Sequence, residues 1–235
     1  MAIKAVLFDL DGTLLPMDQD EFVGAYFKRL AQTLAPCGYE PEKLIKAVWA
    51  GTGAMIKNDG SCTNEQAFWQ VFCGIFGQEA QKDIPAFQRF YENEFQNVRS
   101  VCGFTPKARQ VIDVLQEKGI TVALATNPIF PAIATQSRIR WAGLEPEDFV
   151  LYTTYENSSY TKPNLKYYES ILRKLQLRPE ECLMVGNDVA EDMVAAKLGL
   201  EVFLLTPCML NRGGEDISAY PQGDFDALLD WLRRL

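Results

Sequence analysis

The sequence opens with the apolar run Ile3-Lys4-Ala5-Val6-Leu7-Phe8, which ends in Asp9-Leu10-Asp11-Gly12-Thr13. Such a run is typical of a strand buried on both faces of a parallel sheet. Two carboxylates at the carboxyl end of a buried strand are costly unless a cation lies nearby. Gly12 permits a tight turn whose amide N–H groups could face an anion. Taken alone, the stretch also fits a strand-end turn with two solvated aspartates.

Four further apolar runs resemble the first, and amphipathic segments separate them. The runs are Ile120–Ala125, Phe149–Tyr152, Cys182–Val185 and Glu201–Leu205. The helical patterns are Pro106–Lys118, Pro131–Ala142, Asn164–Leu175, Ala190–Leu198 and Asp224–Leu235. Strands that alternate with helices imply right-handed crossovers. The sequence therefore predicts an α/β fold with a doubly wound parallel sheet between two layers of helices.

One connection breaks this alternation. About 90 residues separate the first strand from the helix at Pro106, far more than an ordinary loop holds. The segment carries helical patterns at Asp20–Leu34, Pro41–Ala50, Thr63–Phe76 and Ile84–Asn97, and Thr63 with Gln66 matches a capping box. We expect an α-helical domain over residues 17–103, inserted into a core formed by residues 1–16 and 104–235.

Composition excludes several kinds of chemistry. The chain has 235 residues, a net charge of −8 and no histidine. Without histidine there is no Ser-His-Asp triad, no Cys-His pair and no His-containing zinc site. The acidic balance also argues against nucleic-acid binding, which needs Lys and Arg patches. Catalysis must then use carboxylates, hydroxyls, amines, thiols, the backbone or a cofactor.

The cysteines and the hydropathy pattern suggest a cytoplasmic location. The six cysteines include no C-x-x-C pair, and we expect them to be free thiols in a reducing compartment. No apolar run approaches the ~20 residues of a membrane span. The first residues do not form a signal peptide, because Asp9 interrupts a short apolar run. We therefore expect no membrane association.

Acidic residues also follow the run at Cys182–Val185. The chain continues Gly186-Asn187-Asp188, with Glu191 and Asp192 close behind. Asp188 could simply cap the next helix, and the negative charges of Glu191 and Asp192 would then interact favourably with the dipole of that helix. In a doubly wound sheet, however, the carboxyl ends of neighbouring strands face one crevice. If the first strand lies between the second and the fourth, the two acidic clusters converge and predict a magnesium ion held by oxygens.

Two further polar pairs stand beside the predicted sheet edge. Thr126-Asn127 follows the second strand, where a hydroxyl and an amide could bind an oxyanion. Lys162-Pro163 stands before the helix that starts near Asn164. Each pair has a plain alternative, because the first could be a turn and the second an exposed lysine before a helix-initiating proline.

Taken in order, these four elements resemble the four motifs of the haloacid dehalogenase-like superfamily, in its aspartate-nucleophile phosphatase branch. The matches are Asp9-Leu10-Asp11-Gly12-Thr13, Thr126-Asn127, Lys162-Pro163 and Gly186-Asn187-Asp188 with Glu191-Asp192. The resemblance implies a Rossmann-like core. The helical insertion lies between the first two motifs, where many members carry a cap over the active site.

The resemblance implies a role for each matched residue. Asp9 would attack the phosphorus of a phosphate monoester, and Asp11 would act as general acid and then general base. Gly12, Thr13, Thr126 and Asn127 would bind the substrate, and Lys162 would neutralise charge on nucleophile and phosphate. Magnesium would be held by Asp9, by the Asp11 backbone carbonyl and by the fourth motif, with Glu191 and Asp192 orienting ligands or metal-bound water.

The fourth motif departs from the common pattern of the family, which often has Asp directly after the Gly. Here Asn187 stands at that position and Asp188 comes next, so either residue could ligate magnesium. The second aspartate of the first motif, Asp11, favours phosphoryl chemistry, because an ester leaving group needs a proton and halide does not. The implied function is hydrolysis of a small phosphorylated metabolite.

Two other functions stay open at this level. A phosphomutase of the β-phosphoglucomutase type looks similar, but it relies on a cap histidine that this chain lacks. A non-catalytic binding protein on the same fold would have no need of a nucleophile. Sugar phosphates, phosphoglycolate, nucleotides and pyrophosphate are all possible substrates, and the oligomeric state is not encoded in any visible pattern.

We expect the aromatic residues of the insertion to be core: Tyr26, Phe27, Trp49, Phe68, Trp69, Phe72 and Phe76. The loop Lys57-Asn58-Asp59-Gly60 is expected to be solvated, with substrate contact as the alternative.

Overall fold

The computed structural model describes residues 2–235 and contains a six-stranded sheet with the order β3-β2-β1-β4-β5-β6. Every pair of neighbouring strands is parallel. The strands are β1 (Ala5–Phe8), β2 (Thr121–Leu124), β3 (Leu151–Tyr152), β4 (Cys182–Gly186), β5 (Glu201–Leu205) and β6 (Gln222–Gly223). The five predicted strands are confirmed, and β1 lies between β2 and β4 as expected. The two-residue edge strand β6 was missed because it is too short to show a pattern.

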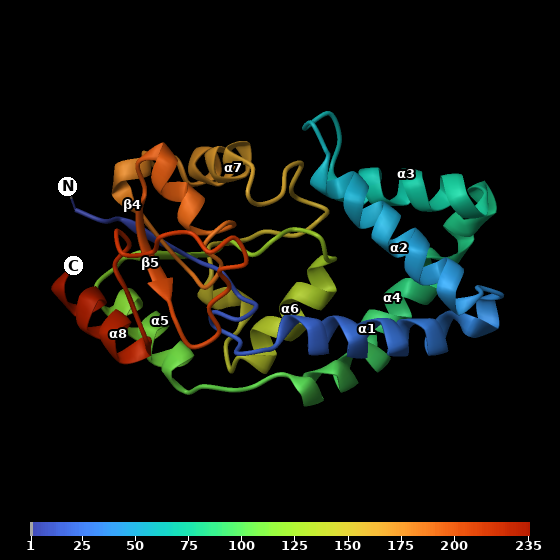
Figure 1. Cartoon of the computed structure of the whole chain (residues 1–235), viewed down its shortest axis with the longest axis horizontal. Coiled ribbons are helices and arrows are strands. Elements are labelled where there is room, and N and C mark those ends of the chain that lie inside the picture. Colours follow the sequence, from blue (N-terminus) through green and yellow to red (C-terminus); the bar gives the residue numbers. More distant parts are fainter. Residues whose placement is uncertain (1) are drawn as a thin grey trace.

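Helices cover both faces of the sheet, which confirms the three-layer α/β/α architecture (Figure 1). Alternate residues of β1 point to opposite faces, since successive side chains of a strand alternate. Val6 and Phe8 belong to the same apolar cluster as the helices α5 and α8, whereas Ala5 and Leu7 pack with α7. The core helices are α5 (Lys107–Glu117), α6 (Ala132–Trp141), α7 (Leu165–Leu175) and α8 (Phe225–Arg234).

The helix expected at Ala190–Leu198 is wrong in part. The chain forms a turn after β4, and a 3₁₀-helix follows only at Met193–Leu198. Asp188 Oδ1 accepts the N–H groups of Ala190 and Glu191, as an N-cap does. No α-helix continues from this cap, since the side chain of Asp192 turns inward beneath the sheet edge and accepts the Asp188 N–H at 3.0 Å.

The inserted segment is helical throughout, as predicted. It holds α1 (Gln19–Leu34), α2 (Pro41–Ile56), α3 (Asn64–Phe76), α4 (Ile84–Glu92) and shorter 3₁₀ turns, including Glu94–Val101. The capping box is confirmed, because Thr63 and Gln66 exchange hydrogen bonds of 3.0 and 3.2 Å. The helix expected at Ile84–Asn97 divides at Asn93 into α4 and the 3₁₀ turns. Helix α2 runs beyond the predicted end at Ala50, and Gly51 there leaves room for the ring of Phe68.

The insertion, called the cap from here on, contacts the core at several places, and one of them is the packing of α6 against α4 and the segment Glu94–Val101. The entry and exit of the cap lie side by side, because Gly103 N–H donates to Pro16 O at 2.7 Å and Met17 pairs with Cys102. The paired residues lie next to the predicted boundaries 16/17 and 103/104, which stay a prediction. The start of α3 is another junction, since the buried amide of Asn64 donates to Pro128 O at 3.0 Å. In Figure 1 the cap helices extend to one side of the sheet.

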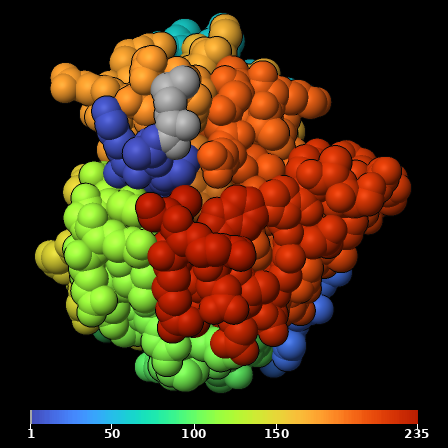
Figure 2. All heavy atoms as spheres, turned by 90° about the vertical axis from the view of Figure 1, so that its left-hand side faces the viewer, coloured from blue at the N-terminus to red at the C-terminus, as the bar shows by residue number. Residues whose placement is uncertain are grey.

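Figure 2 shows the face of the core that lies opposite the cap. There the C-terminal segment in red packs beside the green segment that contains α5, in agreement with the contacts between α5 and α8. All six cysteines are free, as expected. Within residues 2–235, no helix combines the length and the apolarity needed to cross a bilayer.

Candidate active site

A cavity of about 170 Å³ opens at the carboxyl edge of the sheet, where β1 lies between β2 and β4. Residues from three of the four sequence elements line it, as the converging strand ends predict. The polar lining residues are Asp9, Asp11, Gln19, Thr126, Asn127, Asn187, Asp188, Glu191 and Asp192. The remaining motif residues, Gly12, Thr13 and Lys162, lie behind this lining.

Lys162 reaches the site from the loop before α7. Its Nζ donates to Asp9 Oδ1 at 2.8 Å and to Asp192 Oδ1 at 2.6 Å, with only 2% of the residue exposed. Burial alone would lower the pKa of Lys162, but the charges of Asp192 and Asp9 outweigh it and raise that pKa well above the usual value. The ammonium is therefore a fixed positive charge that holds the Asp9 carboxylate in one orientation.

Asp192 holds Lys162 and the loop after β4 in place. One of its carboxylate oxygens accepts from Lys162, and the other accepts the Asp188 N–H at 3.0 Å. A side chain on Gly186 would overlap this carboxylate, so the glycine at the end of β4 is required for the approach. With both oxygens engaged and 1% of the residue exposed, Asp192 positions Lys162 and the loop after β4.

Thr13 links the first and the fourth motifs. Its hydroxyl lies 3.0 Å from Asp9 Oδ2 and 3.0 Å from Asn187 Oδ1. The amide nitrogen of Asn187 donates to Cys208 O at 2.7 Å, which leaves the amide oxygen beside the Thr13 hydroxyl. Two oxygen atoms thus converge beside one hydroxyl at the edge of the sheet.

Gly12 has a backbone φ of +82°, a conformation that glycine adopts without strain, and a Cβ there would overlap the Asn187 amide. Its N–H donates to Leu15 O at 2.8 Å, and the Thr13 N–H donates to Leu10 O at 3.2 Å. Both amides are therefore engaged within the turn. Their expected role as donors to a substrate stays a prediction that this arrangement does not favour.

Asp11 forms an ion pair with Arg138, a residue that sequence reasoning missed. Arg138 comes from α6, is buried, and donates through Nη1 to Asp11 Oδ2. Its guanidinium carbon lies 4.5 Å from the centre of the Phe130 ring. Burial raises the pKa of Asp11, and the nearby Arg138 charge opposes that rise without cancelling it. The other oxygen of Asp11 has no hydrogen-bond partner within residues 2–235.

Thr126 and Asn127 lie at the end of β2, as predicted. Thr153 Oγ1 and the Tyr167 hydroxyl donate to the Thr126 carbonyl at 2.6 and 2.8 Å, so the backbone there is held firmly. Asn127 Nδ2 donates to both oxygens of Glu191, at 3.2 and 3.1 Å. Burial raises the pKa of Glu191 to about 7 despite the opposing charge of Lys162. Sequence reasoning placed Thr126 and Asn127 correctly at the end of β2 but did not identify Tyr167, whose hydroxyl donates to the Thr126 carbonyl.

The site as a whole carries an excess of acidic groups. Five carboxyl groups line the cavity, and Lys162 and Arg138 are the cations that pair with them in the described part of the chain. Within that same part, no three His, Cys, Asp or Glu side chains form a ready-made metal cluster. A metal ion would therefore need amide or carbonyl oxygens and water besides a carboxylate. The converging oxygens of Asp9 and Asn187 fit the preference of magnesium for oxygen ligands.

The comparison with known families agrees with this geometry. Residues 3–199 match the model of the haloacid dehalogenase-like hydrolases, and the chain belongs to that family of hydrolases. The matched residues include the first core segment from Ile3 onward, the whole cap, and the second core segment as far as Gly199.

Individual relatives cover nearly the whole chain. A ribulose-1,5-bisphosphate 5-phosphatase from Halopiger xanaduensis is 28% identical in an alignment that covers 86% of this chain and 84% of the relative. The pyrimidine 5′-nucleotidase PynA from Streptococcus pneumoniae is 28% identical in an alignment that covers 99% of this chain and 96% of the relative. Among solved structures, the putative hydrolase YfnB from Bacillus subtilis bound to magnesium has a TM-score of 0.57 at 18% identity and covers 99% of both chains, which shows a shared fold.

Proposed function

We propose that this protein is a magnesium-dependent phosphatase that hydrolyses a phosphate monoester of a small metabolite through an aspartyl-phosphate on Asp9. One observation carries the proposal: Asp9 lines the cavity with its carboxylate held by Lys162 at 2.8 Å, beside Asp11 in the same cavity. A held carboxylate next to a second carboxyl group with a raised pKa supplies a nucleophile and a proton donor. The phosphatase relatives and the hydrolase family support the same reaction.

In the first step, an oxygen of Asp9 forms a bond to phosphorus while the bond from phosphorus to the alcohol oxygen breaks. The leaving oxygen takes a proton from Asp11. In the second step, Asp11 removes a proton from water, which attacks phosphorus and releases phosphate and the free Asp9 carboxylate. Lys162 holds Asp9 in place and offsets part of the negative charge on the two reacting anions. The Thr126 and Asn127 side chains are proposed to bind phosphoryl oxygens.

Magnesium, when bound, supplies the positive charge that brings an anionic substrate to an acidic site. We assign its protein ligands to Asp9, the Asp11 backbone carbonyl and Asn187. The amide oxygen of Asn187 and Asp9 Oδ2 each lie 3.0 Å from the same Thr13 hydroxyl. Asp188 is the weaker candidate, because its Oδ1 accepts the Ala190 and Glu191 N–H groups at 2.8 and 2.9 Å.

We further propose that residues 17–103 act as a substrate-selecting cap on a core of residues 1–16 and 104–235, in a cytoplasmic enzyme. The paired entry and exit at Pro16 and Gly103 support this division, and six free thiols suit a reducing compartment.

The test is phosphate release from a panel of phosphate monoesters, with and without magnesium, by the wild type and by Asp9→Asn. We expect release that depends on magnesium and is lost in the variant, because an amide is a poor nucleophile. Circular dichroism of the variant checks that it folds. Equal activity of wild type and variant would overturn the assignment of Asp9, and transfer of phosphate within the substrate without net release would favour the mutase.

A further inference from the structure

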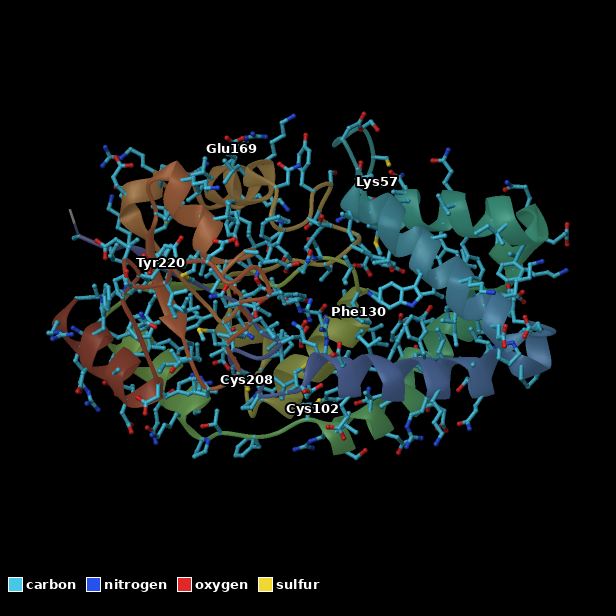
Figure 3. The ribbon with its side chains drawn as sticks, viewed as in Figure 1. Lys57, Cys102, Phe130, Glu169, Cys208 and Tyr220 are labelled. Carbon is cyan, nitrogen blue, oxygen red and sulfur yellow. The ribbon has the colours of Figure 1, made fainter. Side chains whose placement is uncertain are left out.

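A second cavity of about 500 Å³ lies between the cap helices and the core. It adjoins the cavity at the sheet edge, because Val23, Ile129 and Phe130 line both. Phe130 lies at the junction of core and cap (Figure 3). A phosphate held beside Asp9 would therefore extend its alcohol portion past Phe130 into the larger space. The volume falls in the range of sites that bind small organic molecules.

Aromatic rings dominate the wall of this cavity. They come from the cap as Phe27, Trp49, Trp69 and Tyr91, and from the core as Phe130 and Tyr155. Phe27 and Trp49 pack against each other at 5.3 Å between ring centres, yet half of Trp49 is exposed. The expectation that the cap aromatics are core is wrong for the half-exposed Trp49 and holds for the others, which are buried or packed against the core. Of those others, four also line the cavity: Tyr26, Phe27, Phe68 and Trp69. Flat rings in the wall favour a flat ring in the ligand, because aromatic groups stack or meet edge to face.

The charged groups in the wall are all acidic. Glu65 from the start of α3 and Glu156 from the core line the cavity, and no Lys or Arg of residues 2–235 does. Glu65 is held close to this part of the core, because its N–H donates to Tyr155 O at 2.9 Å. Glu156 accepts the Ala132 N–H at 2.9 and 3.0 Å. Burial and, to a smaller extent, the charge of Glu156 raise the pKa of Glu65.

This wall discriminates among phosphate esters by charge. A second phosphate or a carboxylate on the substrate would face Glu65 and Glu156 with no cation to pair with, which costs free energy in a partly desolvated space. An uncharged ring with N–H or O–H donors would instead stack on the aromatic wall and donate to the carboxylates. The same reasoning disfavours phosphoglycolate, sugar bisphosphates and pyrophosphate.

We propose that the substrate is a monophosphate whose leaving alcohol is uncharged, carries a flat ring and has the size of a nucleoside, with the ring in the cavity between cap and core and its donors toward Glu65. This inference rests on the phosphatase function proposed above and deepens it. Nucleoside 5′-monophosphates are the simplest compounds of this class.

The first experiment compares kcat/KM for uridine and adenosine 5′-monophosphates with that for phosphoglycolate, ribulose 1,5-bisphosphate and pyrophosphate. We expect at least one nucleotide to exceed all three anionic substrates by about tenfold or more, which is about 1.4 kcal/mol. Preference for any of the three anionic substrates over both nucleotides would overturn the inference and leave the phosphatase function intact.

The second experiment reverses the charge of the wall with Glu65→Lys. The ratio of kcat/KM for the best nucleotide to that for phosphoglycolate should fall by about tenfold or more, since the new cation would pair with the carboxylate of phosphoglycolate. The matched control is Glu117→Lys at the exposed end of α5, which makes the same charge change away from both cavities and should leave the ratio unchanged. An unchanged ratio in Glu65→Lys would contradict the inference.

A third measurement does not depend on turnover. Uridine and adenosine, without phosphate, are titrated against the tryptophan fluorescence of the wild type and of Trp49→Phe. Saturable quenching by either nucleoside that weakens in Trp49→Phe supports the binding of a flat, uncharged ring in this cavity. Such binding without phosphate release from any compound would refute only the phosphatase function. Absence of saturable quenching by both nucleosides would refute the inference.

Discussion

The two cavities of this molecule are built in different ways. At the sheet edge, the charged groups contact one another, since Lys162 bridges Asp9 and Asp192, and Arg138 pairs with Asp11. In the cavity under the cap, the wall consists mainly of aromatic rings, and Trp49 is half exposed. Charged groups that several partners hold in place are suited to catalysis, because bond formation depends on the orientation of the reacting groups. A wall of aromatic rings with few polar partners is suited to substrate recognition, because the rings can adjust to the ligand. We therefore infer that the core carries the chemistry and the cap the selectivity.

The largest effect that can test this division is expected for Asp11→Asn. Loss of the proton donor should lower kcat by about 10²- to 10⁴-fold on an alkyl phosphate. The loss should be smaller on p-nitrophenyl phosphate, whose leaving group needs no proton. Steady-state kinetics on both substrates, with a thermal melt to confirm folding, make the measurement. Equal losses on the two substrates would show that Asp11 is not the acid.

The next largest effect concerns stability as well as rate. Lys162→Met should destabilise the protein by about 3–5 kcal/mol, because Asp9 and Asp192 would stay buried without their shared cation. Urea unfolding at neutral pH measures the change. The matched control is the exposed Lys166→Met a few residues on, which should change stability by about 0.5 kcal/mol or less. Similar values for the two variants would contradict the bridging role of Lys162.

A smaller effect distinguishes the two metal-ligand candidates. Asn187→Ala should raise the magnesium concentration for half-maximal activity by about tenfold, since an oxygen beside Asp9 is lost. Asp188→Ala should leave that concentration nearly unchanged and lower stability by about 1 kcal/mol, because it removes a cap for two N–H groups. The opposite pattern in the magnesium titrations would move the ligand to Asp188.

The smallest effect is expected in the cap. Trp49→Ala should raise KM for an aromatic phosphate ester by a few fold, about 1 kcal/mol, and leave kcat within about twofold, because the ring contacts the leaving group and not the reacting atoms. Ile75→Ala is the control, since this exposed cap residue lies outside the cavity lining. A large fall in kcat for Trp49→Ala would break the division between chemistry and selectivity.

The sheet and most of the site could be predicted because they depend on local patterns and on one topological rule. Apolar runs placed five strands, and the meeting of strand ends placed Asp9, Asn127 and Asn187 at one edge. Arg138 could not be placed in the same way. An arginine in a predicted helix is expected on the surface, and only the packing of α6 against Phe130 brings Arg138 to Asp11.

The same limit applies to the segment after β4 and to the cap aromatics. Asp188 carried an N-cap signal, and it does cap two N–H groups, but the contacts of Asp192 with Lys162 and the Asp188 N–H replace a regular helix with a turn. Helical spacing predicted that the cap aromatics are buried, which holds for Phe72, while Trp49 faces a cavity. Spacing identifies the apolar side of a helix but does not reveal whether that side meets protein or space.

By itself, the sequence determined the alternation of strands and helices, the length of the insertion and the absence of histidine. The absence of histidine left carboxylates, hydroxyls, amines, thiols, the backbone or a cofactor as the available chemistry. The resemblance of the four motifs to a known family then pointed to two aspartates, Lys162 and magnesium. Only the tertiary structure decided which oxygens converge, which carboxyl groups are already occupied, and that the cap leaves an aromatic, acidic space beside them. The physical reason is the range of the interactions. Hydrophobic periodicity depends on residues that are close together in the chain, so it can be recognised in the sequence. Ion pairs such as Lys162 with Asp9 join residues that are far apart in the chain and meet only after folding.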